Sequence, residues 1–314
     1  MEVVQDSSPK ISMNQKLLDS IISSARSQIS GEVAKYIPEL ACVPENILSA
    51  CIILTEGSKF RGGDDLERRY TLQSISKLVV LIGLLEELGQ KVFDWVRVEP
   101  SGADFSSVAR LDQFGPISAN PMLNDGAITL CNYIPGSSEE RFAWIRRWCH
   151  TLFNCELPPN MSVFASERRY GDRNRSLAYL LKSNGKITEN VETVLESYFY
   201  LCSCEATIGQ IAFLPFLLAN RGLDLQGKRV ISASTVRSVL AIMATCGLYN
   251  ESGSFFLEVG MPGKSSVSGI MVAASVGKAG IAAVNPCVNR KGNSQGALEV
   301  IKQISNQLGY HFAS

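Results

Sequence analysis

The residue pair with the clearest potential for chemistry is Ser74 and Lys77, three positions apart where a short polar turn meets a long apolar run. On an α-helix, residues i and i+3 are neighbours, with Cβ atoms about 5–6 Å apart, so hydroxyl and amine would share one face of the first turn. Unpaired backbone N–H groups and the positive end of the helix dipole lie at the same place. A hydroxyl, an amine and donors for an oxyanion are the parts of a covalent acyl-transfer site.

The surrounding sequence favours this interpretation over a capping serine followed by a solvated lysine, which explains many Ser-x-x-Lys pairs. Residues 78–88 are apolar nearly all round, which predicts a central, buried helix. A lysine in the first turn of such a helix is desolvated, which lowers the pKa of its ammonium group and lets the amine act as a base. Ser76 offers a rival pairing with Lys77, and we take Ser74 as the nucleophile.

The composition describes a globular chain with no charged or apolar segment that would direct it to nucleic acid or membrane. The 314 residues are 46% hydrophobic, and 30 basic residues balance 30 acidic ones. There is no apolar run of transmembrane length and no secretory signal after Met1, and nine cysteines indicate reduced thiols, so we expect a cytoplasmic protein. Two distant histidines and a lone Cys-Ser-Cys give little material for a metal site, and no phosphate-binding glycine motif indicates a nucleotide cofactor.

The order of the predicted elements suggests an α/β (α+β) fold. Strands are predicted at 48–55 and from 59, and β-type runs at 255–259, 269–276 and 279–284. Helices are predicted at 14–29, 141–153, 191–210, 211–219, 234–245 and 297–308, with 191–210 and 211–219 forming a helical hairpin; the polar first twelve residues predict no regular structure. An antiparallel sheet flanked by helices would combine 1–70 and 233–314 into an α/β lobe, with 71–232 as an all-α lobe of one catalytic unit.

A site between two such lobes would take polar residues from distant parts of the chain. Residues 120–126 form a turn-rich loop with two amides, and residues 166–174 are dense in charge; a turn and a solvated helix start are the alternative interpretations. Tyr198 lies in an otherwise apolar helix, where a tyrosine is usually a core residue. Residues 246–249 are followed by a glycine- and serine-rich turn at 260–269, which is suited to presenting backbone N–H groups to an oxyanion.

Together these stretches resemble the serine-dependent glutaminases, which share the fold of serine β-lactamases and penicillin-binding proteins. Nine matching stretches fall in order over about residues 30–310: 36–41, 72–77, 99–102, 120–122, 166–168, 171–174, 201–203, 246–249 and 264–265. The resemblance implies an amidohydrolase that converts L-glutamine to L-glutamate and ammonia without a metal or organic cofactor. It also implies a homo-oligomer, either a dimer or a tetramer.

The resemblance also assigns roles to individual residues. It makes Ser74 the nucleophile and Lys77 its base, with Tyr249 assisting proton transfer. The oxyanion would be held by the backbone N–H groups of Ser74 and Val267. The residues implied to contact glutamine are Tyr36, Gln73, Ser74, Asn120, Glu167, Asn174, Tyr198, Tyr249 and Val267. A buried anion such as Glu167 suits the substrate ammonium, and amide and phenol donors suit its carboxylate.

The chain departs from the family pattern at three positions. Asp125 stands where a small alanine is usual, and Ser266 and Ile270 replace two glycines of the turn that carries Val267. A left-handed backbone at Ser266 or Ile270 would displace the Val267 N–H. A catalytically impaired relative that binds glutamine is therefore one alternative. A penicillin-recognising serine hydrolase is the other, because the Ser-x-x-Lys pair and residues 264–266 also resemble the motifs of that family, although such an enzyme would need an export signal.

Overall fold

A five-stranded antiparallel sheet joins the two ends of the chain. The computed structural model describes residues 12–102 and 105–314. Its main sheet has the strand order β3-β2-β8-β7-β6, with β2 at Ser49–Leu54, β3 at Lys59–Gly63, β6 at Gly263–Ser265, β7 at Ile270–Ser275 and β8 at Ala279–Val284. Strand β2 pairs with β8, so that Ser49 lies opposite Val284. The predicted sheet shared by both ends of the chain is confirmed.

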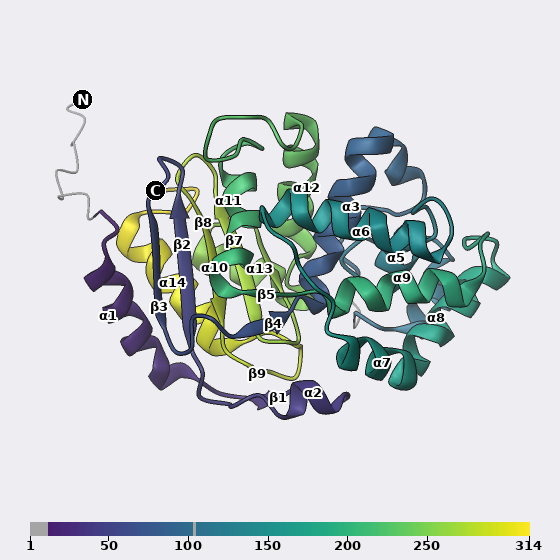
Figure 1. Ribbon diagram of the computed structural model, residues 1–314, viewed down its shortest axis with the longest axis horizontal. Helices are drawn as coiled ribbons and strands as arrows, with labels where there is room; N and C mark the ends of the chain where they lie inside the picture. Colours follow the sequence, from purple (N-terminus) through teal and green to yellow (C-terminus); the bar gives the residue numbers. More distant parts are fainter. Residues whose placement is uncertain (1–11, 103–104) are drawn as a thin grey trace.

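The two faces of this sheet contribute to separate hydrophobic cores because successive side chains of a strand point to opposite sides. Ala50 and Ile52 belong to one core, and Cys51 and Ile53 to the other. Helices α1 (Gln15–Ala25) and α14 (Gln295–Leu308) cover the first face (Figure 1). The short helices α10 (Ile208–Ile211) and α11 (Phe213–Ala219) pack on the second. Helix α11 can come this close only because residue 280 is a glycine, since a Cβ at this position would lie 1.9 Å from the backbone nitrogen of Phe216.

Most of the remaining helices gather beside the sheet, on the right of Figure 1. At their centre is α3 (Ser76–Leu88), in which every residue from 76 to 85 is buried, as predicted for the helix that carries Lys77. Helices α5, α6 and α12 pack against it. The bounds of these helices are α4 Val108–Phe114, α5 Asn124–Cys131, α6 Ser138–Phe153, α7 Met161–Tyr170, α8 Asp172–Ser183, α9 Val191–Ser203 and α12 Ala233–Cys246.

The remaining helices and strands are short. Strands β1 (Glu32–Val33) and β9 (Cys287–Val288) pair with each other, as do β4 (Arg69–Thr71) and β5 (Glu205–Thr207). The other short elements are α2 Pro38–Ala41, α13 Ser252–Val259, and the 3-10 turns η1 Arg26–Gln28, η2 Gln73–Ile75, η3 Gly89–Asp94 and η4 Tyr249–Glu251. No helix in the described part of the chain has the length and apolar character needed to cross a membrane.

The predicted β-type run at 255–259 is wrong, because these residues belong to helix α13. Phe255 and Val259, four residues apart, are buried on one face of the helix, whereas Leu257 is 78% exposed. Gly260 ends the helix in a left-handed conformation at φ +64°. An exposed leucine between buried residues gives the appearance of strand alternation over so short a run.

The predicted single helix at 191–210, and its hairpin with 211–219, are also wrong. Helix α9 ends at Ser203, and β5 follows it and pairs with β4, with Tyr70 opposite Ala206. The partner strand lies more than 130 residues earlier in the sequence, so local periodicity carries no sign of it. Because β4 leads directly into the Ser74 turn, this pairing fixes that turn beside the end of α9.

The division into lobes at 70 and 232 stays a prediction. Helices α10 and α11 fall within 71–232 although they pack on the sheet. Of the first twelve residues, 1–11 lie outside the described part of the chain.

Candidate active site

Ser74 lies in the tight turn η2, immediately before the buried helix α3. Gln73 adopts φ +45°, a left-handed conformation that redirects the chain from strand β4 into the helix. The backbone N–H of Leu72 donates to Cys204 O at 2.8 Å, which ties the turn to the end of α9. Ser74 lines a cavity of about 310 Å³, whereas the buried Ser76 donates its hydroxyl to Gln73 O at 2.7 Å. The geometry therefore gives Ser74, and not Ser76, access to a ligand.

Lys77 is buried one helical turn after Ser74. Its Nζ donates to Met122 O at 2.9 Å and to Asn124 Oδ1 at 2.7 Å. Burial lowers the pKa of Lys77 to about 8, although Cys202 and Asp125 act in the opposite direction. A neutral amine has two N–H groups and one lone pair. Because two acceptors already take the N–H groups, the lone pair is left to accept a proton.

Tyr249 lies against two buried amines. The Nζ atoms of Lys264 and Lys77 lie 4.4 and 5.6 Å from the centre of its ring, and Lys264 Nζ donates to the Tyr249 hydroxyl at 3.3 Å. Burial, reinforced by the nearby Lys77, holds the pKa of Lys264 well below its ordinary value. The centre of the Phe105 ring lies 4.9 Å from the centre of the Tyr249 ring. The Tyr249 ring therefore lies beside two lysines whose pKa values burial lowers.

The turn that carries Val267 is not distorted by the two replaced glycines. Neither Ser266 nor Ile270 has a positive φ; the left-handed position of the turn is Gly269, at φ +85°. The Ser266 N–H donates to Ile270 O at 2.9 Å, and Val267 lines the same cavity as Ser74. The buried Ser266 hydroxyl also donates to Leu72 O at 3.0 Å. A direct hydrogen bond thus joins the Val267 turn to the segment that precedes Ser74.

A buried carboxylate, Glu167, forms the polar end of the cavity. Its Oε1 accepts from the Tyr36 hydroxyl at 2.7 Å and from Gln73 Nε2 at 3.1 Å. Burial raises the pKa of Glu167, and these two hydrogen bonds partly offset the rise. The hydroxyl of Tyr36 reaches inward although 46% of the residue is exposed. Tyr198 lines the cavity too, and burial raises the pKa of its phenol.

Two of the three asparagines near the site face the cavity. Asn124 and Asn174 line it, and Asn124 Nδ2 donates to Asn174 Oδ1 at 2.9 Å. Asn120 does not line it, because its side chain donates to Glu99 O at 2.8 Å and accepts from Met122 N at 3.0 Å. Sequence reasoning selected Asn120 and missed Asn124. Both belong to one turn-rich loop, and the sequence does not reveal which amide points inward.

Further residues at the cavity were also missed. Phe105, Ser106, Tyr170, Gly171, Arg173 and Cys202 complete its lining. Arg173 Nε donates to Ser106 O at 2.8 Å, and Asn124 N donates to Phe105 O at 2.9 Å. Hydrogen bonds from helices α8 and α5 therefore hold the segment at 105–106 beside the cavity. Tyr170, Gly171 and Arg173 fall inside the charged stretch 166–174 and Cys202 inside the matching stretch 201–203, whereas Phe105 and Ser106 gave no signal in the sequence.

Asp125, the departure from the family pattern, pairs with Arg110 in the protein interior. Their side chains are 3% and 4% exposed. Burial raises the pKa of Asp125, and the Arg110 guanidinium counteracts that rise. The pair joins helix α4, which follows the segment at 105–106, to helix α5, which carries Asn124. Asp125 does not line the cavity itself, and it stabilises the helix whose first residue, Asn124, does.

Comparison with known proteins identifies a family that spans nearly the whole chain. The glutaminase family model matches residues 31–312. A glutaminase of Legionella pneumophila is 47% identical over 300 residues, covering 95% of this chain and 97% of its own length, and one of Clostridium tetani is 40% identical over 94% and 98%.

Solved structures of glutaminases superpose closely. The probable glutaminase YbaS has a TM-score of 0.90 at 32% identity, covering 96% of this chain and all of its own. The Bacillus subtilis glutaminase YbgJ, in a covalent complex with 5-oxo-L-norleucine formed by reaction with 6-diazo-5-oxo-L-norleucine, has a TM-score of 0.86 at 30% identity over 95% and 99% of the two chains. The chain belongs to the glutaminase family, whose members are hydrolases acting on the side-chain amide of glutamine.

Proposed function

We propose that Ser74 attacks the side-chain amide of L-glutamine and that the reaction passes through a γ-glutamyl ester on its Oγ. The bond from Oγ to the amide carbon forms while the serine proton moves to a neutral Lys77, directly or through Tyr249. The C–N bond then breaks, and the leaving nitrogen takes up this proton and departs as ammonia. Water then gives a proton to the neutral Lys77 and adds to the ester carbon, the bond from this carbon to Ser74 Oγ breaks, Oγ takes up that proton, and L-glutamate is released.

The observation that carries this proposal is the hydrogen bonding of Lys77. Met122 O and Asn124 Oδ1 occupy its two amine N–H groups, and burial lowers the pKa of Lys77 to about 8. An unpaired, exposed lysine would be protonated at neutral pH and could not accept a proton. The Ser74 and Val267 residues line one cavity, which supports the assignment of their N–H groups to the oxyanion.

The polar groups of the cavity suit both charged ends of a free amino acid. Glu167 is the anionic group for the substrate ammonium, and Tyr36 and Gln73 hold it in place. Asn174 and Tyr198, together with Asn124, supply donors for the substrate carboxylate. Asn120 acts indirectly, by holding the loop that presents Asn124.

The test combines turnover with covalent labelling. Ser74→Ala should abolish ammonia release and prevent labelling by 6-diazo-5-oxo-L-norleucine, whereas the matched variant Ser76→Ala should keep labelling on the peptide that contains Ser74. Mass spectrometry locates the adduct, and thermal unfolding checks that both variants are folded. Turnover by Ser74→Ala, or an adduct on another residue, refutes the assignment.

Two further assays separate the alternatives. A chromogenic β-lactam tests for a penicillin-recognising hydrolase, and calorimetry that detects glutamine binding without ammonia release would indicate an impaired relative. The ordinary backbone of Ser266 and Ile270 supports an active enzyme. We further propose a cytoplasmic dimer or tetramer: all nine cysteines are free thiols, which suits a reducing compartment, and light scattering would measure the oligomeric state.

A further inference from the structure

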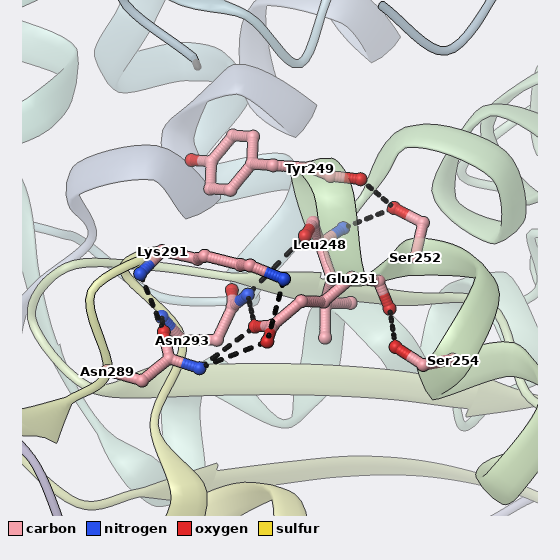
Figure 2. A network of polar contacts seen from close by, with 8 residues as sticks. All are labelled: Leu248, Tyr249, Glu251, Ser252, Ser254, Asn289, Lys291 and Asn293. Carbon is pink, nitrogen blue, oxygen red and sulfur yellow. Dashed lines mark hydrogen bonds and ion pairs between the residues drawn. The ribbon is translucent and has the colours of Figure 1, made fainter. Parts of the chain in front are cut away.

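The turn that carries Tyr249 is strained, and something must hold it. Tyr249 adopts φ +55°, a left-handed conformation that costs a non-glycine residue free energy and persists only where neighbouring groups enforce it. Its neighbour Ser252 supplies part of this restraint. The Ser252 hydroxyl accepts from Leu248 N at 3.0 Å and donates to Tyr249 O at 2.9 Å (Figure 2).

A second restraint on this turn comes from Glu251, two residues after Tyr249. Its carboxylate accepts from Asn289 Nδ2 at 2.9 Å and from Asn293 Nδ2 at 2.5 Å, and Lys291 Nζ lies 3.6 Å away. Figure 2 shows these three side chains converging on the one carboxylate. Asn293 also donates to Leu248 O at 3.4 Å, so the same amide holds both sides of the strained residue.

The loop at 289–293 is itself well ordered by hydrogen bonds. Asn289 Oδ1 accepts from the backbone N–H groups of Lys291 and Asn293 at 2.9 and 3.1 Å. The loop also contacts the reaction site: a Cβ placed on Gly292 would lie 3.5 Å from Val267 Cγ1 and 3.7 Å from Phe105 Cε1. It therefore lies beside the oxyanion turn and beside the aromatic ring that covers Tyr249.

We propose that Glu251 is a positioning residue that holds Tyr249 over Lys77 and Lys264 by fastening its turn to the loop at 289–293. Neither Glu251 nor Tyr249 is among the residues that line the cavity with Ser74. Glu251 reaches the site only through the turn that places the Tyr249 ring beside Lys77 and Lys264, so its role is to position Tyr249. Both asparagine amides donate to Oε2 of Glu251, and its Oε1 lies 3.2 Å from Asn289 Nδ2 and 3.6 Å from the Lys291 ammonium. A glutamine would turn an NH₂ group toward at least one of these donors, and the fastening would loosen.

The proposal rests on the proposed function, in which the Tyr249 hydroxyl takes part in proton transfer. Glu251→Gln should lower kcat about tenfold to a hundredfold, the range expected when a reacting group is displaced by up to about 1 Å. KM for glutamine should change less than about twofold, because Glu167 and the asparagines are untouched. The matched control is Glu258→Gln, which removes a surface carboxylate paired with Lys302 and should change neither constant.

A double-mutant cycle separates positioning from general support of the fold. If Glu251 acts through the Tyr249 hydroxyl, Glu251→Gln should add almost nothing to the loss already caused by Tyr249→Phe. Asn289→Ala, which removes one donor and leaves two, should lower kcat in the same direction and by less. Losses that multiply in the double variant, or a Glu251→Gln enzyme with unchanged kcat, overturn the proposal.

A second measurement does not depend on activity. Hydrogen–deuterium exchange of the peptide covering 248–254 should accelerate in Glu251→Gln, whereas exchange in the peptide that contains Ser74 should stay as in the parent protein. Unchanged exchange at 248–254 overturns the positioning role even if turnover falls. Failure of the parent protein to release ammonia would instead refute the proposed function, so the two failures are distinguishable.

Discussion

The pKa of Lys77 determines how the rate depends on pH. With a pKa of about 8, roughly one tenth of the amine is neutral at pH 7, against about three in ten thousand for a lysine with an unshifted pKa. The reactive form is the deprotonated one, so kcat/KM should rise about tenfold per pH unit below pH 7 and bend near pH 8. Ammonia release from glutamine, measured between pH 6 and 8.5, gives this profile.

Replacing the amide partner of Lys77 shifts this profile in a known direction. Asn124→Asp places a carboxylate where an amide oxygen now lies 2.7 Å from Nζ. An opposite charge at such a distance raises the pKa of a lysine by about 1–3 units. The bend should therefore move above pH 9, and kcat/KM at pH 7 should fall at least about tenfold further.

The matched control is Asn306→Asp, which adds the same charge on the exposed side of α14 and should leave the bend near pH 8. A rate that does not vary between pH 6 and 8 would refute a base with the pKa of Lys77. So would a bend that stays in place in Asn124→Asp, since the added carboxylate must favour the ammonium form.

Three further predictions concern buried polar groups. Glu167→Gln should raise KM for glutamine strongly and raise the thermal unfolding temperature at pH 7, because burial raises the pKa of this carboxyl and its charge opposes folding above that pKa. Asp125→Ala should cost about 3–5 kcal/mol in urea unfolding, since it leaves Arg110 buried and unpaired. Ser266→Ala should cost about 0.5–1.5 kcal/mol and lower kcat, because Leu72 O loses one of its two donors and keeps only the Ile75 N–H.

Each of these predictions has its own contradicting result. An unfolding temperature that falls in Glu167→Gln would mean that the hydrogen bonds from Tyr36 and Gln73 outweigh the cost of burial. For Asp125→Ala, the double variant with Arg110→Met should recover part of the lost stability, and no recovery would exclude the unpaired charge as the cause. An unchanged kcat in Ser266→Ala would show that the Val267 turn is held without this bond.

The parts of the fold that follow local rules could be predicted. The buried helix after Ser74 follows from its continuous apolar residues, and β8 follows from an apolar run between glycine-containing turns. The pairing of both chain ends in one sheet followed from the order of elements. The mistaken strand at 255–259 and the mistaken helix at 191–210 share a cause: tertiary contacts decide the outcome where local propensity is ambiguous.

The residues of the candidate site also fall into those that local spacing predicts and those that only tertiary contacts determine. Ser74 and Lys77 are related by helical spacing, so the sequence alone predicts that they are neighbours. The inward direction of Asn124 is held by its hydrogen bonds with Lys77 and Asn174, and no periodicity in the sequence indicates these contacts. The contacts of Glu251 with Asn289 and Asn293 join segments about 40 residues apart by side-chain hydrogen bonds, which leave no pattern in the sequence.

The strand order also constrains how the chain is made. Strand β2 is translated early, yet its neighbour β8 begins only at residue 279, so the hairpin of β2 and β3 leaves the ribosome with one hydrogen-bonding edge open. Exposed apolar edges of this kind recruit other strands. A nascent chain stalled before β8 would therefore be prone to aggregate, and completion of synthesis, rather than collapse of the helices, would release it from that hazard.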